Sequence, residues 1–172
     1  FKKRLSELKE YSSAFLGVSD FISSKLVKEG FPEEKVFTHY LGIKFFKNKI
    51  NISNKNNFLF LGRLVEKKGV DILIDAIKIL NNQGVYINVN IAGTGILEKK
   101  LKRRSSGLKN INFLGWKSKE EVKKIFIQST ALIVPSKTSD NGDSEGLPTV
   151  ILEGISYGRL VITSNHSGAP EI

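Results

Sequence analysis

From residue 58 onward, short runs of apolar, β-branched and aromatic residues alternate with segments whose apolar residues recur at helical spacing. The runs predict five strands, at 58–61, 86–91, 111–114, 131–134 and 160–163. The segments between them predict helices at 70–80, 95–104, 118–128 and 147–157. Strands separated by single helices pair in parallel through crossover connections. The pattern therefore predicts an α/β fold with a doubly wound parallel sheet covered on both faces.

The chain before residue 58 follows a different pattern. It predicts a helix over 2–11, a short strand over 15–18, a helix over 20–29 and a strand over 36–40. Asp20 is suited to cap the second of these helices, and Gly30 is suited to end it. The polar stretch 47–57 then carries five Asn together with Lys and Ser, which indicates a linker or a long loop.

Charge narrows the range of partners. The 172 residues include 27 Lys and Arg against 17 Asp and Glu, for a net charge of +10. This excess favours an anionic partner such as a phosphate ligand, a nucleic acid or an acidic membrane face. Much of it is scattered over presumed helix faces, where a solvated surface is the simpler interpretation, and no basic stripe interleaved with aromatic residues is present.

Cysteine usage and hydropathy bear on the compartment. The absence of Cys excludes disulfides and thiolate metal sites and suits a cytosolic protein. No run of about eighteen apolar residues is present to span a bilayer. We therefore expect a cytoplasmic chain, with peripheral contact at the inner face of the membrane as the alternative. Because the chain begins at Phe1 and contains no Met, we expect it to be a piece of a longer protein.

The first cluster with recognisable chemistry is the loop 62–69, which directly follows a predicted strand and precedes the helix at 70–80. Ligands of open parallel sheets bind outside the carboxyl ends of the strands, so cations in this loop are expected to project into the crevice. Arg63 and Lys68 are suited to hold the two phosphates of a nucleoside diphosphate, Arg as a planar fork and Lys as a point charge. The alternative is that any loop of so basic a chain contains an Arg and a Lys.

The second cluster, at 145–153, also follows a predicted strand and opens a predicted helix. Pro148 is permitted in a first helical turn, and Gly146 allows close approach of a ligand to the backbone. The start of the helix offers free amides and partial positive charge to an anion. Glu145 and Glu153, slightly more than two turns apart, are expected to point to a similar side and to accept hydrogen bonds from hydroxyls. The alternative is that Glu153 is a solvated surface group.

Together these clusters resemble the donor-binding signature of the retaining family 4 glycosyltransferases, enzymes of GT-B architecture. The motif G-R-x-x-x-x-K-G is followed by E-x7-E with G-L-P inside it. The resemblance covers nearly the whole chain, because further segments match the family at 17–19, 39–43, 91–95, 111–115 and 168–172.

The resemblance implies a Rossmann-like C-terminal domain that binds a nucleotide-diphosphate sugar. Arg63 and Lys68 would neutralise the pyrophosphate, aided by the amides around Leu147 and Thr149. Glu153 would bind the ribose hydroxyls, and Glu145 would lie beside the transferred sugar. The nucleotide-binding set also includes the turn glycines, the base-contacting pair and the residues of the G-L-P segment: Gly93, Gly95, Trp116, Lys117, Gly146, Leu147 and Pro148. Catalytic roles fall to Glu145, Arg63 and Lys68.

The resemblance also implies the domain organisation and the reaction. Residues 1–44 would be the tail of an N-terminal acceptor domain with the interdomain crossing, and 45–172 a donor-binding domain truncated at its C-terminus. The reaction would transfer the sugar with retention to a glycan or lipid-linked acceptor, without a metal or other cofactor, because cations and helix dipoles stabilise the leaving group. The isolated piece is expected to bind donor without catalysing transfer.

Other motifs in the sequence give weaker evidence about function. Gly93 and Gly95 lack the third glycine of a dinucleotide fingerprint, and 140–143 lacks the spacing of a calcium loop. His39 and His166 have no Cys or spaced partner for a metal. Two other classes remain open, a noncatalytic sugar-nucleotide module and a nucleic-acid-binding α/β domain. The complete set of Arg63, Lys68, Glu145 and Glu153 argues against the first, and the phosphate-type loops with few aromatics argue against the second.

Overall fold

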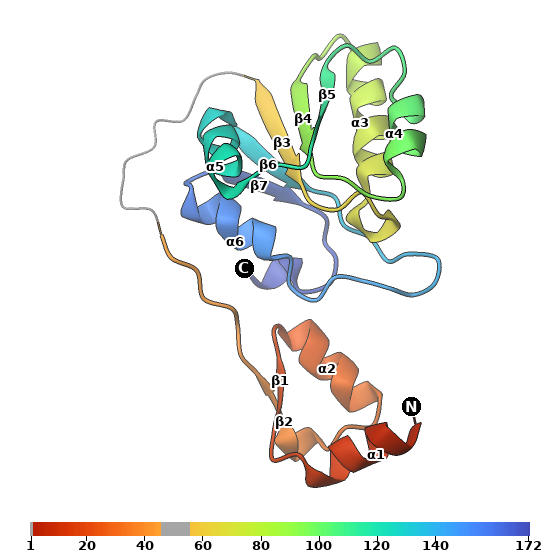
Figure 1. Cartoon of the computed structure of the whole chain (residues 1–172), viewed down its shortest axis with the longest axis vertical. Helices are drawn as coiled ribbons and strands as arrows, with labels where there is room; N and C mark the ends of the chain where they lie inside the picture. The colour runs from red at the N-terminus through yellow and green to blue at the C-terminus, as the bar shows by residue number, and fades with distance from the viewer. Residues whose placement is uncertain (1, 46–55) are drawn as a thin grey trace.

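The computed structural model describes residues 2–45 and 56–172 and arranges them in two parts (Figure 1). The larger part is a five-stranded parallel sheet with helices on both faces, as expected for a doubly wound α/β fold. The smaller part lies N-terminal to it and contains a two-stranded sheet. Most of the polar stretch predicted as a linker, residues 47–55, lies outside the described residues, whereas Asn57 begins the first strand of the larger sheet.

The strand order of the large sheet is β5-β4-β3-β6-β7. Its members are β3 (Asn57–Leu61), β4 (Asn88–Ala92), β5 (Ile111–Gly115), β6 (Ala131–Val134) and β7 (Leu160–Thr163). The chain builds outward from β3 through β4 to β5, then returns to the other side of β3 to place β6. The direction of winding therefore reverses between β3 and β6, and the loops after these two strands diverge to leave a crevice.

Two pairs of helices cover the sheet (Figure 1). Helices α3 (Val70–Asn82) and α4 (Glu98–Arg104) pack on one face, and α5 (Lys119–Gln128) and α6 (Thr149–Ser156) on the other. The neighbouring residues Leu59 and Phe60 show how β3 serves both cores, because alternate side chains of a strand point to opposite faces. Phe60 packs in the α3 core, and Leu59 packs with Phe126 in the α5 and α6 core.

Helix α5 begins one residue later than predicted, and two further helices begin two or more residues later. Helix α4 begins at Glu98 rather than at residue 95, because Leu97 N–H donates to the Leu64 carbonyl at 3.1 Å and the intervening residues form a turn. Helix α6 begins at Thr149, so Pro148 is its N-cap rather than a residue of its first turn. Strand β4 is also shifted, to Asn88–Ala92 from the predicted 86–91.

The N-terminal part contains α1 (Lys2–Tyr11), β1 (Phe15–Gly17), α2 (Asp20–Lys28) and β2 (Val36–Thr38). Strands β1 and β2 are parallel. The prediction that Asp20 caps α2 was wrong, because the cap is Ser19, whose Oγ accepts a hydrogen bond from Ile22 N–H at 3.2 Å. Gly30, with φ +81°, follows the C-cap Glu29 and ends the helix as expected.

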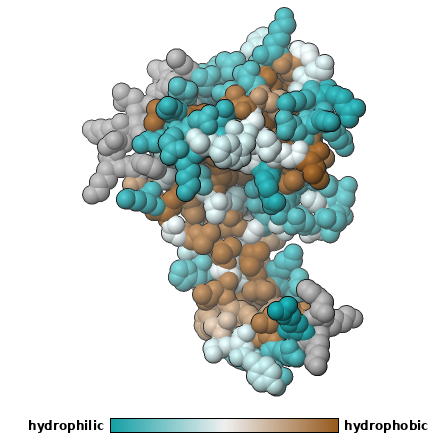
Figure 2. Space-filling model, in the orientation of Figure 1, coloured by the Kyte–Doolittle hydropathy of each residue, from teal (hydrophilic) through white to brown (hydrophobic). Residues whose placement is uncertain are grey.

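The two parts meet where α2 begins. The Glu171 carboxylate, in the 3-10 turn η3 (Ala169–Glu171), accepts hydrogen bonds from the amides of Asp20 at 2.7 Å and Phe21 at 2.9 Å. Tyr40 Oη donates to the same carboxylate at 3.0 Å. Figure 2 shows hydrophobic side chains gathered on the visible face where the parts meet. A negative side chain at the positive end of α2 therefore joins the N-terminal part to the sheet domain.

Candidate nucleotide-sugar site

The loop after β3 is held against the end of β6 by a glycine. Gly69 has φ +65°, and a Cβ atom on it would lie 1.8 Å from the Pro135 carbonyl oxygen. No larger residue fits this approach, and the preceding 3-10 turn η2 (Glu66–Lys68) is thereby placed beside the loop that leaves β6. Lys68 thus reaches the crevice between β3 and β6, as the sequence predicted for a loop at a strand's carboxyl end.

A pocket of about 260 Å³ opens at this crevice. It is lined by Leu61, Gly62, Lys68, Glu145, Leu147, Thr149, Val150 and Glu153. Lys68 Nζ donates a hydrogen bond to Glu145 Oε2 at 2.9 Å across the pocket, and only 15% and 12% of the two side chains are exposed. The structure therefore brings together five of the predicted residues, namely one cation, both glutamates, Leu147 and Thr149.

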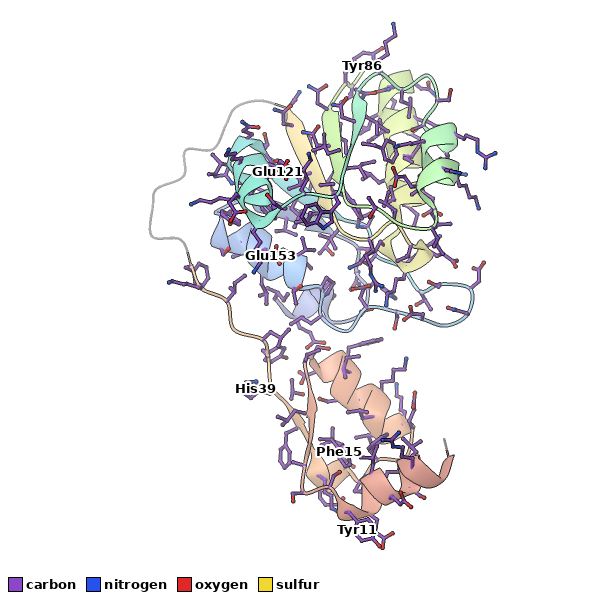
Figure 3. All side chains as sticks on the ribbon, in the orientation of Figure 1. Tyr11, Phe15, His39, Tyr86, Glu121 and Glu153 are labelled. Atoms are coloured by element: carbon purple, nitrogen blue, oxygen red, sulfur yellow. The ribbon has the colours of Figure 1, made fainter. Side chains whose placement is uncertain are left out.

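Glu153 enters this pocket from α6. It is partly buried, and its carboxylate makes no hydrogen bond or ion pair within the described residues. Burial raises the pKa of its carboxyl above the ordinary value. Figure 3 shows Glu153 on α6 and Glu121 on the neighbouring α5. An acceptor held partly out of water without a partner is free to bind a hydroxyl group of a ligand.

A second pocket of about 260 Å³ continues from the first and shares Leu61 and Gly62 with it. Its other lining residues are Arg63, Gly93, Thr94, Trp116 and Lys117. Arg63 is exposed and its side chain makes no ion pair or hydrogen bond within the described residues, so its guanidinium is available to an anion. Trp116 is 72% exposed and offers an aromatic face at this pocket. Arg63, Trp116 and Lys117 therefore share a pocket, as the resemblance implied.

A third cavity, of about 340 Å³, adjoins the first on the side of α5. It is lined by Ile43, Lys44, Leu61, Lys117, Lys119, Val122, Glu153, Ser156 and Tyr157. Glu153 and Leu61 belong to both, so the three hollows form one continuous region along the carboxyl edge of the sheet.

Three of the predicted residues line none of these pockets. Gly95 packs against the Leu64 backbone, where a Cβ atom would lie 2.4 Å from the carbonyl oxygen. Gly146 faces Val18 and Ile22 of the N-terminal part, and Pro148 is fully buried. Gly93 does line the second pocket, and its φ of +130° allows the β4 loop to approach Gly62. Gly95, Gly146 and Pro148 therefore shape the backbone around the site.

Sequence reasoning missed two charged residues beside the site. Lys67 Nζ lies 3.0 Å from Asp143 Oδ2 and 3.6 Å from Glu145 Oε1. Two signals in the sequence mark them: a second lysine directly before Lys68, and an acid two positions before Glu145. Nothing in that pattern shows that the two loops bring them together.

The sequence predicted neither a metal site nor a membrane-spanning segment. Within 2–45 and 56–172, no group of three or more His, Asp or Glu side chains is arranged to hold a metal ion. No helix in the same ranges is long and apolar enough to cross a membrane. The expectation that the reaction needs no metal stays a prediction.

Comparison with known proteins matches residues 42–172 to the family described as "Glycosyl transferases group 1". The chain is 32% identical to the amylovoran biosynthesis glycosyltransferase AmsK of Erwinia amylovora, over 99% of this chain and 44% of that protein. It is 30% identical to the putative colanic acid biosynthesis glycosyltransferase WcaL of Escherichia coli, over 91% of this chain and 40% of that protein. The chain thus spans less than half the length of these relatives.

Solved structures support the same fold. The Anabaena protein HepE, solved in complex with UDP and glucose, aligns with a TM-score of 0.79 over 99% of this chain and 49% of its own, at 18% identity. Staphylococcus aureus TarM aligns with a TM-score of 0.83 over 99% of this chain and 33% of its own, at 16% identity. At such low identity these similarities establish the α/β fold of the GT-B glycosyltransferases, and they do not assign a ligand.

Proposed function

The chain belongs to the glycosyl transferases group 1 family, and we propose that it forms the donor-binding half of a retaining family 4 enzyme. Its substrate would be a nucleotide-diphosphate sugar, from which a hexosyl group passes to a glycan or lipid-linked acceptor. The relatives named for amylovoran and colanic acid biosynthesis support polysaccharide assembly as the setting. HepE, solved with UDP-glucose, supports the choice of donor class.

One observation carries the proposal: Lys68, Glu145 and Glu153 line a single pocket at the carboxyl ends of β3 and β6. In this assignment Lys68 and the unpaired Arg63 bind the pyrophosphate, one from each of two adjoining pockets. Glu153 accepts the ribose hydroxyls. Trp116 and Lys117 contact the base from the neighbouring pocket.

The proposed chemistry uses electrostatics and needs no metal. Negative charge that builds up on the leaving diphosphate is stabilised by Lys68, Arg63 and the free amides at the start of α6. Retention follows if the leaving diphosphate deprotonates the acceptor on the face from which it departs. Glu145 then stabilises positive charge on the sugar without attacking it.

We place this reaction in the cytoplasm, with the net charge of +10 favouring peripheral contact with an anionic membrane face. The 172-residue stretch by itself would bind donor without transferring sugar, because it spans 44% of AmsK and an acceptor needs a second wall.

The proposal is tested by thermal stabilisation of this chain with UDP, GDP, ADP and their sugars, with and without a chelator. A ligand present at 100 times its Kd raises the free energy of unfolding by about 2.7 kcal/mol. We expect one base series to stabilise the chain equally in both conditions. Stabilisation that vanishes with chelator would refute the metal-free assignment, and no stabilisation by any nucleotide would refute the function.

A further inference from the structure

Four charged side chains form a cluster between the turn η2 and the loop before α6. Lys67 Nζ contacts both oxygens of Asp143, at 3.1 Å and 3.0 Å, and lies 3.6 Å from Glu145 Oε1. Lys68 Nζ contacts the other oxygen of Glu145 at 2.9 Å. One carboxylate thus lies between two lysines, and among the described residues only Lys67 is anchored by a second carboxylate.

Further hydrogen bonds hold the same two segments together. The amide of Lys137 donates to the Lys67 carbonyl at 2.9 Å, and the amide of Asp140 donates to Glu66 Oε1 at 3.1 Å. Asp143 is tied into its own loop through its carbonyl, which accepts from Ser139 N–H at 2.8 Å. Figure 1 shows this loop as the long excursion between β6 and α6. None of these hydrogen bonds involves the side chain of Lys68, so they can hold Lys67 and Asp143 in place when that side chain moves.

The two oxygens of Glu145 differ in their partners. Oε2 accepts the hydrogen bond of Lys68, whereas Oε1 is buried and has no hydrogen-bond partner among the described residues. If Lys68 turns to a pyrophosphate, Glu145 loses its only hydrogen bond in the cluster. The side chain of Glu145 is only 12% exposed, so an uncompensated carboxylate there is costly.

We propose that Lys67, anchored by Asp143, is a positioning residue that holds Glu145 in place while Lys68 moves from Glu145 to the donor pyrophosphate. This inference rests on the proposed function. Lys67 supplies the positive charge that Glu145 keeps after Lys68 has left, and Asp143 stops Lys67 from following Lys68 to the phosphate. Glu145 then keeps its place at the pocket when the donor is bound.

The role predicts different effects on two ligands. Both ligands draw Lys68 from Glu145, so Lys67→Ala should weaken UDP binding, because Glu145 is then left without a positive charge. Affinity for UDP-glucose should fall about tenfold further, because in this assignment Glu145 also lies beside the sugar. Lys67→Arg should restore it. Asp143→Asn should also lower the affinity for UDP-glucose. Combined with Lys67→Ala it should lower that affinity little further, because the two residues act as one unit.

Calorimetry with UDP and UDP-glucose, and with GDP and GDP-mannose, gives the ratio of sugar-nucleotide affinity to diphosphate affinity for each variant. The matched control is Lys137→Ala. Lys137 lies in the same loop as Asp143 and pairs with Asp71 of α3 at 2.8 Å, so this variant removes an ion pair that does not involve Glu145. A cooperative thermal unfolding transition close to that of wild type shows that each variant is folded. A parallel loss for diphosphate and sugar nucleotide, or a ratio no different from that of Lys137→Ala, would overturn the positioning role alone. If wild type bound neither pair, the proposed function would fail and this role with it.

Discussion

At the scale of single residues, the two cations of the proposed site start from different states. Lys68 is already paired with Glu145 in the free chain, whereas Arg63 is exposed and unpaired within the described residues. Replacing either with Ala should weaken nucleoside diphosphate binding by about 1.5 to 3 kcal/mol. The loss should be larger for Arg63, because Lys68 must first give up Glu145. Calorimetry of both variants checks this, with the exposed, unpaired Arg103→Ala on α4 as control. Unchanged affinity in both would remove them from the site.

We predict that the Glu153 carboxyl strengthens ligand binding and lowers the stability of the folded chain. Burial raises the pKa of its carboxyl, so the charged form is less favourable in the folded chain than in the unfolded chain. Glu153→Gln should therefore raise the Tm near neutral pH while weakening nucleotide and sugar-nucleotide binding alike, by about 1.5 to 3 kcal/mol. The Tm gain should shrink as the pH falls through the raised pKa, where wild type takes up a proton. Thermal scans across pH measure this, and a Tm difference independent of pH would contradict the assignment.

At the scale of elements, the geometry of the site depends on Gly69, because glycine has no side chain to keep this turn away from the end of β6. Gly69→Ala would strain a residue with φ +65° and push a Cβ atom into the Pro135 carbonyl, so we expect a cost of at least about 2 kcal/mol. Gly84→Ala is the matched control, because its φ is +77° and nothing lies within 4 Å of the new atom. It should cost about 1 to 2 kcal/mol from backbone strain alone. Denaturant unfolding compares them, and equal costs would show that the approach to β6 is unimportant.

Element boundaries show where sequence patterns stop being sufficient. Strand β6 and the start of α3 were predicted to the residue, because buried apolar runs and helical spacing determine them locally. The starts of α4 and α6 were not. Leu97 is tied to the Leu64 backbone, and Pro148 is buried at the N-terminus of its helix, which are both consequences of packing between segments distant in sequence. Ser19 rather than Asp20 caps α2 for a similar reason, since the amides of Asp20 and Phe21 bind Glu171.

At the scale of the whole molecule, Glu171 joins the N-terminal part to the sheet domain. Glu171→Ala should remove both hydrogen bonds at the start of α2 and cost about 1 to 2 kcal/mol. Desolvation and hydrogen bonds to Glu171 and Asp20 raise the pKa of Tyr40 to about 12, so the variant should also lower that pKa. Hydrogen exchange at the amides of Asp20 and Phe21 should accelerate. The control is Glu33→Ala, which removes another exposed acid and should change neither the exchange at these amides nor the pKa of Tyr40. Unchanged exchange at α2 would contradict the contact.

The site as a whole was predictable only in part. Lys68, Glu145 and Glu153 were expected to meet because their segments follow strands of one parallel sheet, and they do line one pocket. The partnership of Lys67 with Asp143 was not predictable, because it depends on how a long loop folds back over η2. Loop geometry of that kind leaves no periodic signal in the sequence.

The central claim, that nucleotide binds at the carboxyl ends of β3 and β6, is tested most directly by mapping amide chemical shifts. The 19.2 kDa chain suits a titration of 15N-labelled protein with UDP, GDP and ADP, followed by the corresponding sugar nucleotides. The account predicts the largest changes in residues 62–68, Leu147, Thr149 and Val150, with further changes at Trp116 and Lys117 and none on α4. Changes centred on α4 or on the N-terminal part, or no change with any nucleotide, would contradict it.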